Sequence, residues 1–159
     1  MRLPLCRRAV ASQWLLVLCA AAAVGAETPP VAHRGAMASL QPEIFGESAA
    51  YERFMGRWSR RLAPLLVKFA GVRDGDSILD VGSGTGALTF AVAETAPSSR
   101  IVGVDPSAAY VAFAQVRVSS DRVRFVVGDA QQLQMADAAF DRVLSLLVMN
   151  FIPDREKAL

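Results

Sequence analysis

The chain has 159 residues, of which 53% are hydrophobic, and its 17 basic and 15 acidic residues give a formal net charge of +2. This length has room for one domain with a single core. The near balance of charge gives no electrostatic case for binding nucleic acid or an anionic membrane surface.

Residues 1–26 have the layout of a secretory signal peptide. Three arginines precede an apolar stretch over residues 14–24, small residues at 24–26 suit cleavage, and no acidic residue occurs before Glu27. The stretch is too short to span a bilayer, so no stable membrane span is expected after removal of the leader. Removal leaves 14 of the 17 basic residues against 15 acidic ones. A basic transit peptide, a twin-arginine signal and a translation start at Met37 are the alternatives.

Both cysteines, Cys6 and Cys19, lie in this leader, and the single histidine, His33, lies in residues 27–47. That segment holds three prolines and two glycines without a periodic apolar face, which predicts a linker. The rest of the chain therefore cannot form a disulfide, a thiolate or histidine metal site, or a Ser-His-Asp triad. We expect no metal.

Two helical stretches are expected ahead of the first strand. Ser48 is a suitable N-cap for a helix that runs through Tyr51 and Trp58, because apolar residues recur there at helical spacing. Pro64 should start or kink a second helix, which carries apolar residues at 65–69.

From residue 77 onward, strand and helix patterns alternate. Strands are expected at 77–81, 100–105, 123–128 and 140–147, with helices at about 86–95 and 107–117. This alternation requires right-handed crossovers and a parallel sheet, so we predict an α/β fold. A spatial strand order of 3-2-1-4 would put the switch point between the first and fourth strands, where open α/β sheets bind their ligands.

The most informative stretch is the turn after the first strand. Gly82, Gly84 and Gly86 alternate where the strand must turn into a helix, and Asp80 precedes them in the strand. Glycine tolerates positive φ and lets a ligand approach the bare backbone, and the start of the following helix presents free N–H groups. The turn predicts a nucleoside-type cofactor site.

Two further strands also end in an acidic residue. Asp105 follows the glycines by about 20 residues, where a ribose-binding carboxylate is expected. Asp129 ends the third strand in the sequence Gly128-Asp129-Ala130. Each acid alone could be a helix N-cap, because Asp is favoured there. Three successive strands that end in Asp, each before a helical pattern, favour a shared site.

The glycine spacing is G-x-G-x-G, with the third glycine one residue earlier than in a dinucleotide fingerprint. With this spacing the chain resembles the class I S-adenosylmethionine-dependent methyltransferases, most closely the ubiquinone and menaquinone biosynthesis type. The resemblance covers residues 48–159. It rests on four motifs, at 79–86, 102–105, 128–130 and 140–145.

The resemblance implies a Rossmann-like sheet of seven strands, of which this chain holds the first four with their flanking helices. Residues 48–159 would form the N-terminal part of an S-adenosylmethionine-binding domain. The chain ends inside what the family would make the helix after the fourth strand, so we expect a truncated chain. The fourth strand, with Val143, Leu144, Leu146 and Leu147, would then be an exposed apolar edge.

The resemblance also implies roles for individual residues. The three glycines of the turn would let the methionine end of the cofactor lie on the loop, and Asp80 would help to orient its amino group. Asp105 would accept from both ribose hydroxyls, while Asp129 and Ala130 would meet the adenine edge. The full expected set is Asp80, Gly82, Ser83, Gly84, Thr85, Gly86, Asp105, Pro106, Asp129, Ala130 and Ser145.

The implied function is methyl transfer from S-adenosyl-L-methionine to a small-molecule acceptor. No obligatory base is implied, so no catalytic residue is named. Tyr51 could touch the cofactor or pack in the core. Residues 149–152 are candidates for part of the acceptor wall.

Two other functions remain open from the sequence. Asp105 would also suit the ribose of NAD(P) in an oxidoreductase, and a truncated chain could be a non-catalytic remnant. The leader adds a conflict, because S-adenosylmethionine is made and used inside cells. The sequence therefore leaves export and a cytoplasmic protein that starts at Met37 both open, and it predicts no oligomeric state.

Overall fold

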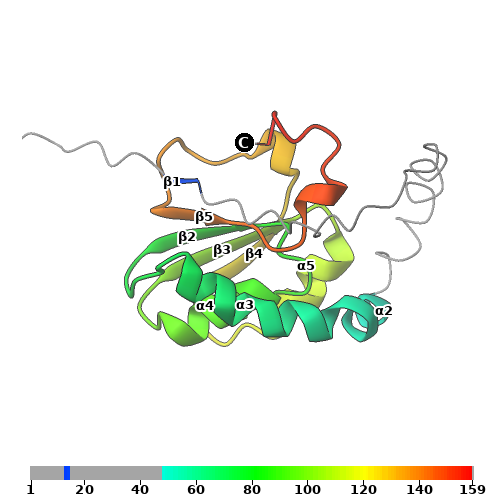
Figure 1. The fold of residues 1–159 in the computed structure, drawn as a ribbon, viewed down its shortest axis with the longest axis horizontal. Coiled ribbons are helices and arrows are strands. Elements are labelled where there is room, and N and C mark those ends of the chain that lie inside the picture. Colours follow the sequence, from blue (N-terminus) through cyan, green and yellow to red (C-terminus); the bar gives the residue numbers. More distant parts are fainter. Residues whose placement is uncertain (1–12, 15–47, 159) are drawn as a thin grey trace, which may run out of the picture.

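The computed structural model describes residues 13–14 and 48–158 (Figure 1). The rest of the expected leader, the expected linker and Met37 lie outside the described residues. The strands are β1 (Gln13–Trp14), β2 (Ser77–Val81), β3 (Arg100–Asp105), β4 (Val123–Val127) and β5 (Arg142–Leu144). The helices are α2 (Ser48–Tyr51), the π-helical turn η1 (Glu52–Gly56), α3 (Arg57–Phe69), α4 (Ala87–Thr95), α5 (Ala108–Gln115), and the short 3-10 helices η2 (Ala130–Gln132) and η3 (Met149–Phe151).

The strands form one parallel sheet in the order β1-β5-β2-β3-β4. The four strands predicted from the sequence are β2 to β5, and their predicted order 3-2-1-4 is confirmed. β2 and β3 run side by side from Ser77 opposite Arg100 to Val81 opposite Val104. Both strands therefore end at the same edge of the sheet, where the glycine turn begins.

The fourth predicted strand, β5, is shorter than the expected 140–147. Its outer edge was expected to be exposed, but it is paired. It ends at Leu144, and Leu147 has a φ of 61°, which an extended strand cannot contain. On the outer side β1 pairs with it, Gln13 opposite Arg142 and Trp14 opposite Val143. The chain thus leaves the sheet early and turns over its carboxyl edge.

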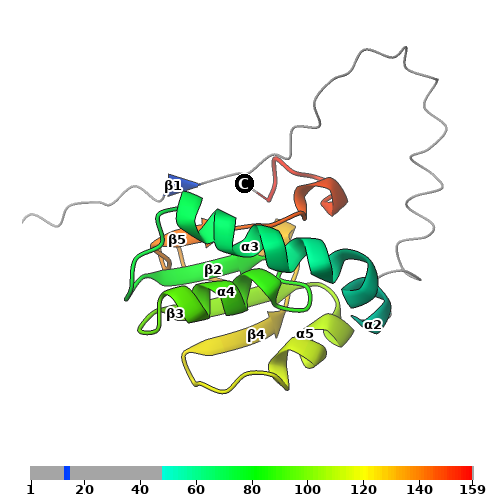
Figure 2. The same ribbon diagram turned by 60° about the horizontal axis from the view of Figure 1, so that its bottom comes forward.

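Helices α3, α4 and α5 all cover one face of the sheet (Figure 2). α2 begins at Ser48, the residue predicted as its N-cap, and continues through η1 into α3. Pro64 lies inside α3 on its exposed side, so the expectation that it starts a second helix is wrong. The buried side chains of α3, which include Leu66 and Val67, pack against the core from the other side of the helix and outweigh the backbone hydrogen bond that the proline removes.

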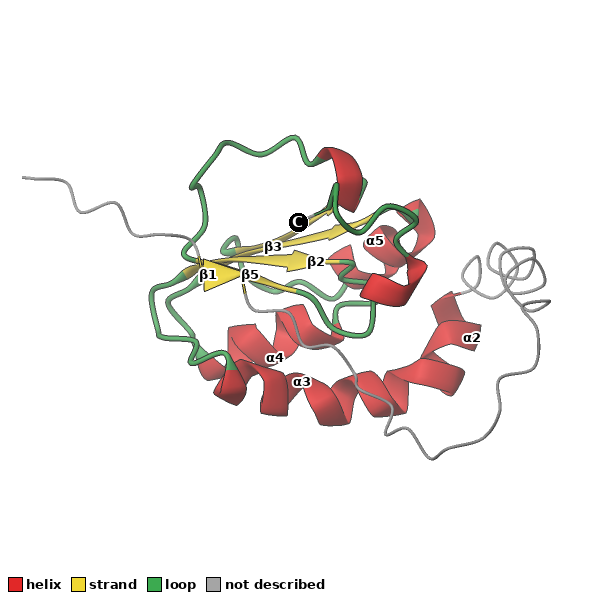
Figure 3. Ribbon diagram, turned by 45° about the horizontal axis from the view of Figure 1, so that its top comes forward, coloured by secondary structure: helices red, strands yellow, loops and turns green. Residues whose placement is uncertain are grey.

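The strands send alternate side chains to two apolar clusters, as the period of two requires. On the helical face, Ile78 packs with side chains of α3 and α4 that include Leu66 and Val92. On the other face, Leu79 and Val81 pack with side chains from the segment between η2 and β5. That segment runs back over the sheet from the carboxyl edge, opposite the helices (Figures 1 and 3).

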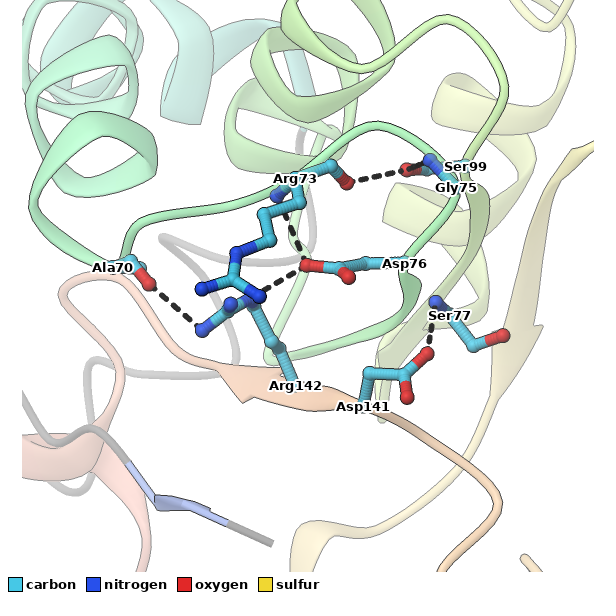
Figure 4. A network of polar contacts seen from close by, with 8 residues as sticks. All are labelled: Ala70, Arg73, Gly75, Asp76, Ser77, Ser99, Asp141 and Arg142. Atoms are coloured by element: carbon cyan, nitrogen blue, oxygen red, sulfur yellow. Dashed lines mark hydrogen bonds and ion pairs between the residues drawn. The ribbon is translucent and has the colours of Figure 1, made fainter. Parts of the chain in front are cut away.

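A polar network ties the starts of β2 and β5 together at the amino edge of the sheet (Figure 4). Arg142 Nε lies 2.6 Å from Asp76 Oδ2, and Arg142 Nη1 donates to the carbonyl of Ala70 at 2.9 Å. The Ser77 N–H donates to Asp141 Oδ2 at 2.8 Å. These contacts fix β5 beside β2 and hold the end of α3, at the edge opposite the glycine turn.

Candidate functional site

A cavity of about 440 Å³ opens at the carboxyl ends of β2, β3 and β4. This is the position where open α/β sheets bind ligands, and the volume lies in the usual range of small-molecule pockets. Its lining comes from α2, the glycine turn, the strand ends, the start of α5 and the segment after β5. The lining residues are Tyr51, Gly82, Gly84, Val104, Asp105, Pro106, Ser107, Tyr110, Gly128, Asp129, Ala130, Gln131, Leu147, Val148, Phe151, Ile152 and Pro153.

The three glycines of the turn all have left-handed backbones, as predicted. Gly82, Gly84 and Gly86 have φ values of 72°, 53° and 93°, a region that other residues enter only with strain. Space is also restricted, because a Cβ on Gly82 would lie 2.3 Å from Val148 Cγ1. The turn therefore requires glycine for conformation and, at Gly82, for the close approach of the cavity wall.

The turn is tied to the end of β3 by its own N–H groups. Gly82 and Ser83 both donate to the carbonyl of Val104, at 2.8 and 2.9 Å, and Gly84 donates to Asp105 Oδ2 at 2.8 Å. Gly86 forms the N-cap of α4. The turn and the acid predicted to share a site are therefore in direct contact.

Asp105 lies at the centre of this arrangement. It is 7% exposed, and its second oxygen, Oδ1, accepts from the Ser107 N–H at 2.9 Å. Burial raises the pKa of its carboxyl group, while the two backbone hydrogen bonds oppose that rise. An ionised carboxylate offers about four acceptor positions, so two remain for a ligand.

Asp80 is placed differently from the other predicted acids. It points to the helical side of the sheet, is 1% exposed, and its Oδ2 accepts from Thr89 Oγ1 at 2.6 Å. Burial raises its pKa to about 7. The side chain lies outside the cavity lining, so in this structure it supports α4 from behind the glycine turn.

Asp129 lies at the cavity and also serves as a helix cap, the alternative that the sequence left open. Its Oδ1 accepts from the Gln131 N–H at 2.8 Å at the start of η2. The hydrogen bonds that Gln131 donates to this carboxylate, chiefly from its backbone N–H and then from its side-chain amide, lower the pKa of Asp129. Ala130 and Pro106 line the same cavity.

Six residues of the predicted set therefore line one cavity, and five do not line it. The lining members are Gly82, Gly84, Asp105, Pro106, Asp129 and Ala130, and the others are Asp80, Ser83, Thr85, Gly86 and Ser145. Ser83 Oγ and Ser145 Oγ are buried without a hydrogen-bond partner among the described residues. The Thr85 hydroxyl donates to the carboxylate of Glu52.

The outer wall of the cavity was only partly predicted. Phe151 and Ile152 line it as expected, whereas the expected Met149 and Asn150 do not. Tyr51, which could have been a core residue, also lines it, and its ring lies 5.2 Å from that of Tyr110. Leu147, Val148 and Tyr110 were missed. The one available signal was for Tyr110, an aromatic residue in the first turn after the cap Ser107.

This chain is similar in sequence and fold to known proteins. The family described as methyltransferase domain matches residues 78–159. The erythromycin 3''-O-methyltransferase of Saccharopolyspora erythraea is 41% identical over 92 residues, which cover 55% of this chain and 30% of that protein. The demethylmenaquinone methyltransferase of Thermus thermophilus is 36% identical over 105 residues, which cover 65% of this chain and 46% of that protein.

A solved structure of coclaurine N-methyltransferase, bound to N-methylheliamine and SAH, has the same fold. It matches with a TM-score of 0.52 and 26% identity, over 57% of this chain and 27% of that chain. The chain thus spans less than half the length of these relatives. None of these matches supports the oxidoreductase alternative. The family match covers more than half of the chain and includes the glycine turn, so the chain belongs to the methyltransferase domain family of S-adenosylmethionine-dependent enzymes.

Proposed function

We propose that the protein transfers a methyl group from S-adenosylmethionine to a small-molecule acceptor. The observation that carries the proposal is the contact between Gly84 and Asp105 at the floor of the cavity, 2.8 Å from N to Oδ2. It joins a bare backbone turn to a buried carboxylate at the switch point of the sheet. The names of the relatives support methyl transfer. Because the relatives are longer than this chain, the activity is proposed for the whole protein.

The residues present fit this methyl donor. The two acceptor positions left on Asp105 match the two hydroxyls of a ribose. Gly82 and Gly84 would lie along the amino-acid end, where no side chain intervenes. Asp129 and Ala130, at the end of β4, would meet the adenine edge, and the exposed carboxylate would accept from its amino group.

When bound, the donor supplies an electrophilic methyl group on a sulfonium sulfur. The task of the chain is then to hold the reactants in line and to exclude water, and neither task requires a general base. Leu147, Val148 and Ile152 form an apolar wall over the turn that would exclude water. No histidine or cysteine is needed in residues 48–159, which contain neither.

The acceptor is proposed as a small organic molecule, on the model of the relatives named as erythromycin and demethylmenaquinone methyltransferases. The near balance of charge gives no support for a nucleic acid acceptor. Among the described residues, no helix is long and apolar enough to cross a membrane. We propose that the reaction takes place inside the cell, where the donor is made. The alternative is export with removal of residues 1–26, which N-terminal sequencing of the protein would detect.

Calorimetric titration of the full chain with S-adenosylhomocysteine tests the proposal, with NAD as the comparison ligand. Circular dichroism first establishes that the protein is folded. Saturable binding of S-adenosylhomocysteine alone is the expected result. A folded chain that binds neither ligand would favour the non-catalytic remnant, and binding of NAD alone would overturn the family-based proposal.

A further inference from the structure

A glutamate of the N-terminal helical segment contacts the glycine turn from outside the cavity. It lies in η1, a single π-helical turn between α2 and α3, and such turns are rare and frequent at functional sites. One oxygen of the Glu52 carboxylate accepts from Thr85 Oγ1, and the other pairs with Arg60. In Figure 2 the start of this segment, α2, lies beside α5. The segment therefore reaches the turn through a carboxylate that accepts a hydrogen bond from it.

Thr85 is the residue between the second and third glycines of the turn. It is 1% exposed and does not line the cavity. Its carbonyl accepts from Arg117 Nη1 at 3.1 Å, so the residue is held from the α5 side as well as from η1. Its neighbour Gly84 does line the cavity and donates to Asp105. A shift of Thr85 would therefore move the backbone of the neighbouring residue, Gly84, which faces the ligand cavity.

Gly56, at the end of η1, leaves the space that this contact needs. Its φ of −56° and ψ of −38° are ordinary helical values, so the backbone conformation does not require glycine. A Cβ at this position would lie 2.6 Å from Glu52 Oε2 and 3.0 Å from Arg60 Nη1. Since glycine weakens a helix relative to alanine, the missing side chain has a steric use here: it makes room for the Glu52 carboxylate.

We propose that Glu52 is a positioning residue that holds the glycine turn in its ligand-binding shape through the hydroxyl of Thr85. The inference rests on the proposed function, because it assigns this contact a role at the same site. A solvated ion pair with Arg60 would not require a buried threonine as second partner. By fixing the turn before the ligand arrives, the contact lowers the conformational cost of binding.

The test measures the affinity of the full chain for S-adenosylhomocysteine by calorimetry. Glu52→Ala is expected to weaken binding about 10-fold, the scale of losing one hydrogen bond to a charged group. Glu52→Gln keeps an amide oxygen that can accept from Thr85, so it should retain more affinity than Glu52→Ala. Glu94→Ala, which removes an exposed glutamate from α4, is the matched control and should bind like the wild type.

Gly56→Ala separates positioning from a merely structural role. Alanine should keep the melting temperature close to that of the wild type, because its gain in helix propensity offsets the contacts that Glu52 loses. It displaces the Glu52 carboxylate and should weaken binding in the same direction as Glu52→Ala. Glu52→Ala and Thr85→Val remove the two sides of one hydrogen bond. The double variant should therefore lose less affinity than the sum of the two single losses.

The outcomes separate this inference from the proposed function. If the wild type binds S-adenosylhomocysteine and folded Glu52→Ala and Gly56→Ala bind equally well, the positioning role is refuted. Additive effects of Glu52→Ala and Thr85→Val would also overturn it. If the folded wild type does not bind, the proposed function itself has failed, and the inference that rests on it fails for that separate reason.

Discussion

Replacing Asp105 by asparagine tests the centre of the site with the smallest change in shape. The carboxylate accepts from Gly84 N at 2.8 Å through one oxygen and from Ser107 N at 2.9 Å through the other. Asparagine keeps a single carbonyl oxygen and places an NH₂ donor where the second oxygen stood. It can therefore keep only one of the two backbone contacts, and it can no longer accept from both hydroxyls of a ribose.

The two effects have separate magnitudes. One backbone N–H left buried without an acceptor costs about 1–3 kcal/mol of unfolding free energy, partly offset because a neutral amide costs less to bury than a carboxylate. Hydrogen bonds to a charged group contribute about 1.5–3 kcal/mol, so the loss of the ribose contacts should weaken S-adenosylhomocysteine binding about 10- to 150-fold.

Urea unfolding followed by circular dichroism measures the first effect, and calorimetric titration of the folded variant measures the second. Asp121→Asn is the control, because Asp121 is exposed and precedes β4 at the amino edge of the sheet. It should change neither quantity. A folded Asp105→Asn protein with wild-type affinity would refute the ribose role of Asp105.

Three further predictions follow from the geometry. Gly82→Ala should destabilise the protein in urea by more than Gly71→Ala, because both glycines have positive φ, which costs about 1–2 kcal/mol for alanine, but only at Gly82 would the new Cβ meet Val148, at 2.3 Å. Burial raises the folded pKa of Asp80 from 3.8 to about 7. The stability that its protonated form contributes is therefore present below the unfolded pKa and is lost as the pH rises through the folded pKa. Asp80→Asn should remove that fall in stability between pH 4 and pH 7, which urea unfolding at each pH measures. Arg142→Ala should lower the unfolding free energy by about 1–3 kcal/mol through loss of its ion pair and carbonyl contact, while S-adenosylhomocysteine affinity stays unchanged, because Arg142 lies at the opposite edge of the sheet.

The glycine turn and its acid could be predicted because their signals are local. An apolar strand, alternating glycines and a following helix specify the backbone path within residues 77–95, and the positive φ values confirm it. Asp105 ends the neighbouring parallel strand, and parallel pairing brings the ends of such strands together. The strand order followed from the same alternation and the handedness of crossovers.

The outer wall of the cavity depends on features that leave no local signal. Leu147 adopts a φ of 61°, which ends β5 early and turns the chain over the cavity, yet leucine has no preference for that conformation. The pairing of Gln13–Trp14 with β5 joins segments more than 100 residues apart, and a two-residue strand has no periodicity to detect. Both errors therefore concern β5, where tertiary contacts override the local pattern.

The helical segment before the sheet shows how the same residue type carries opposite information in two places. At Gly82 a glycine is required by its backbone angle, and the alternating pattern in the turn indicates this directly. At Gly56 the angle is ordinary, so the sequence shows only a residue that weakens a helix. Its use becomes visible when the Glu52 carboxylate is found in the space that a side chain would fill. If that space serves the glycine turn through Thr85, the N-terminal helix is part of the binding site, even though Tyr51 alone among the described side chains of its first turns lines the cavity.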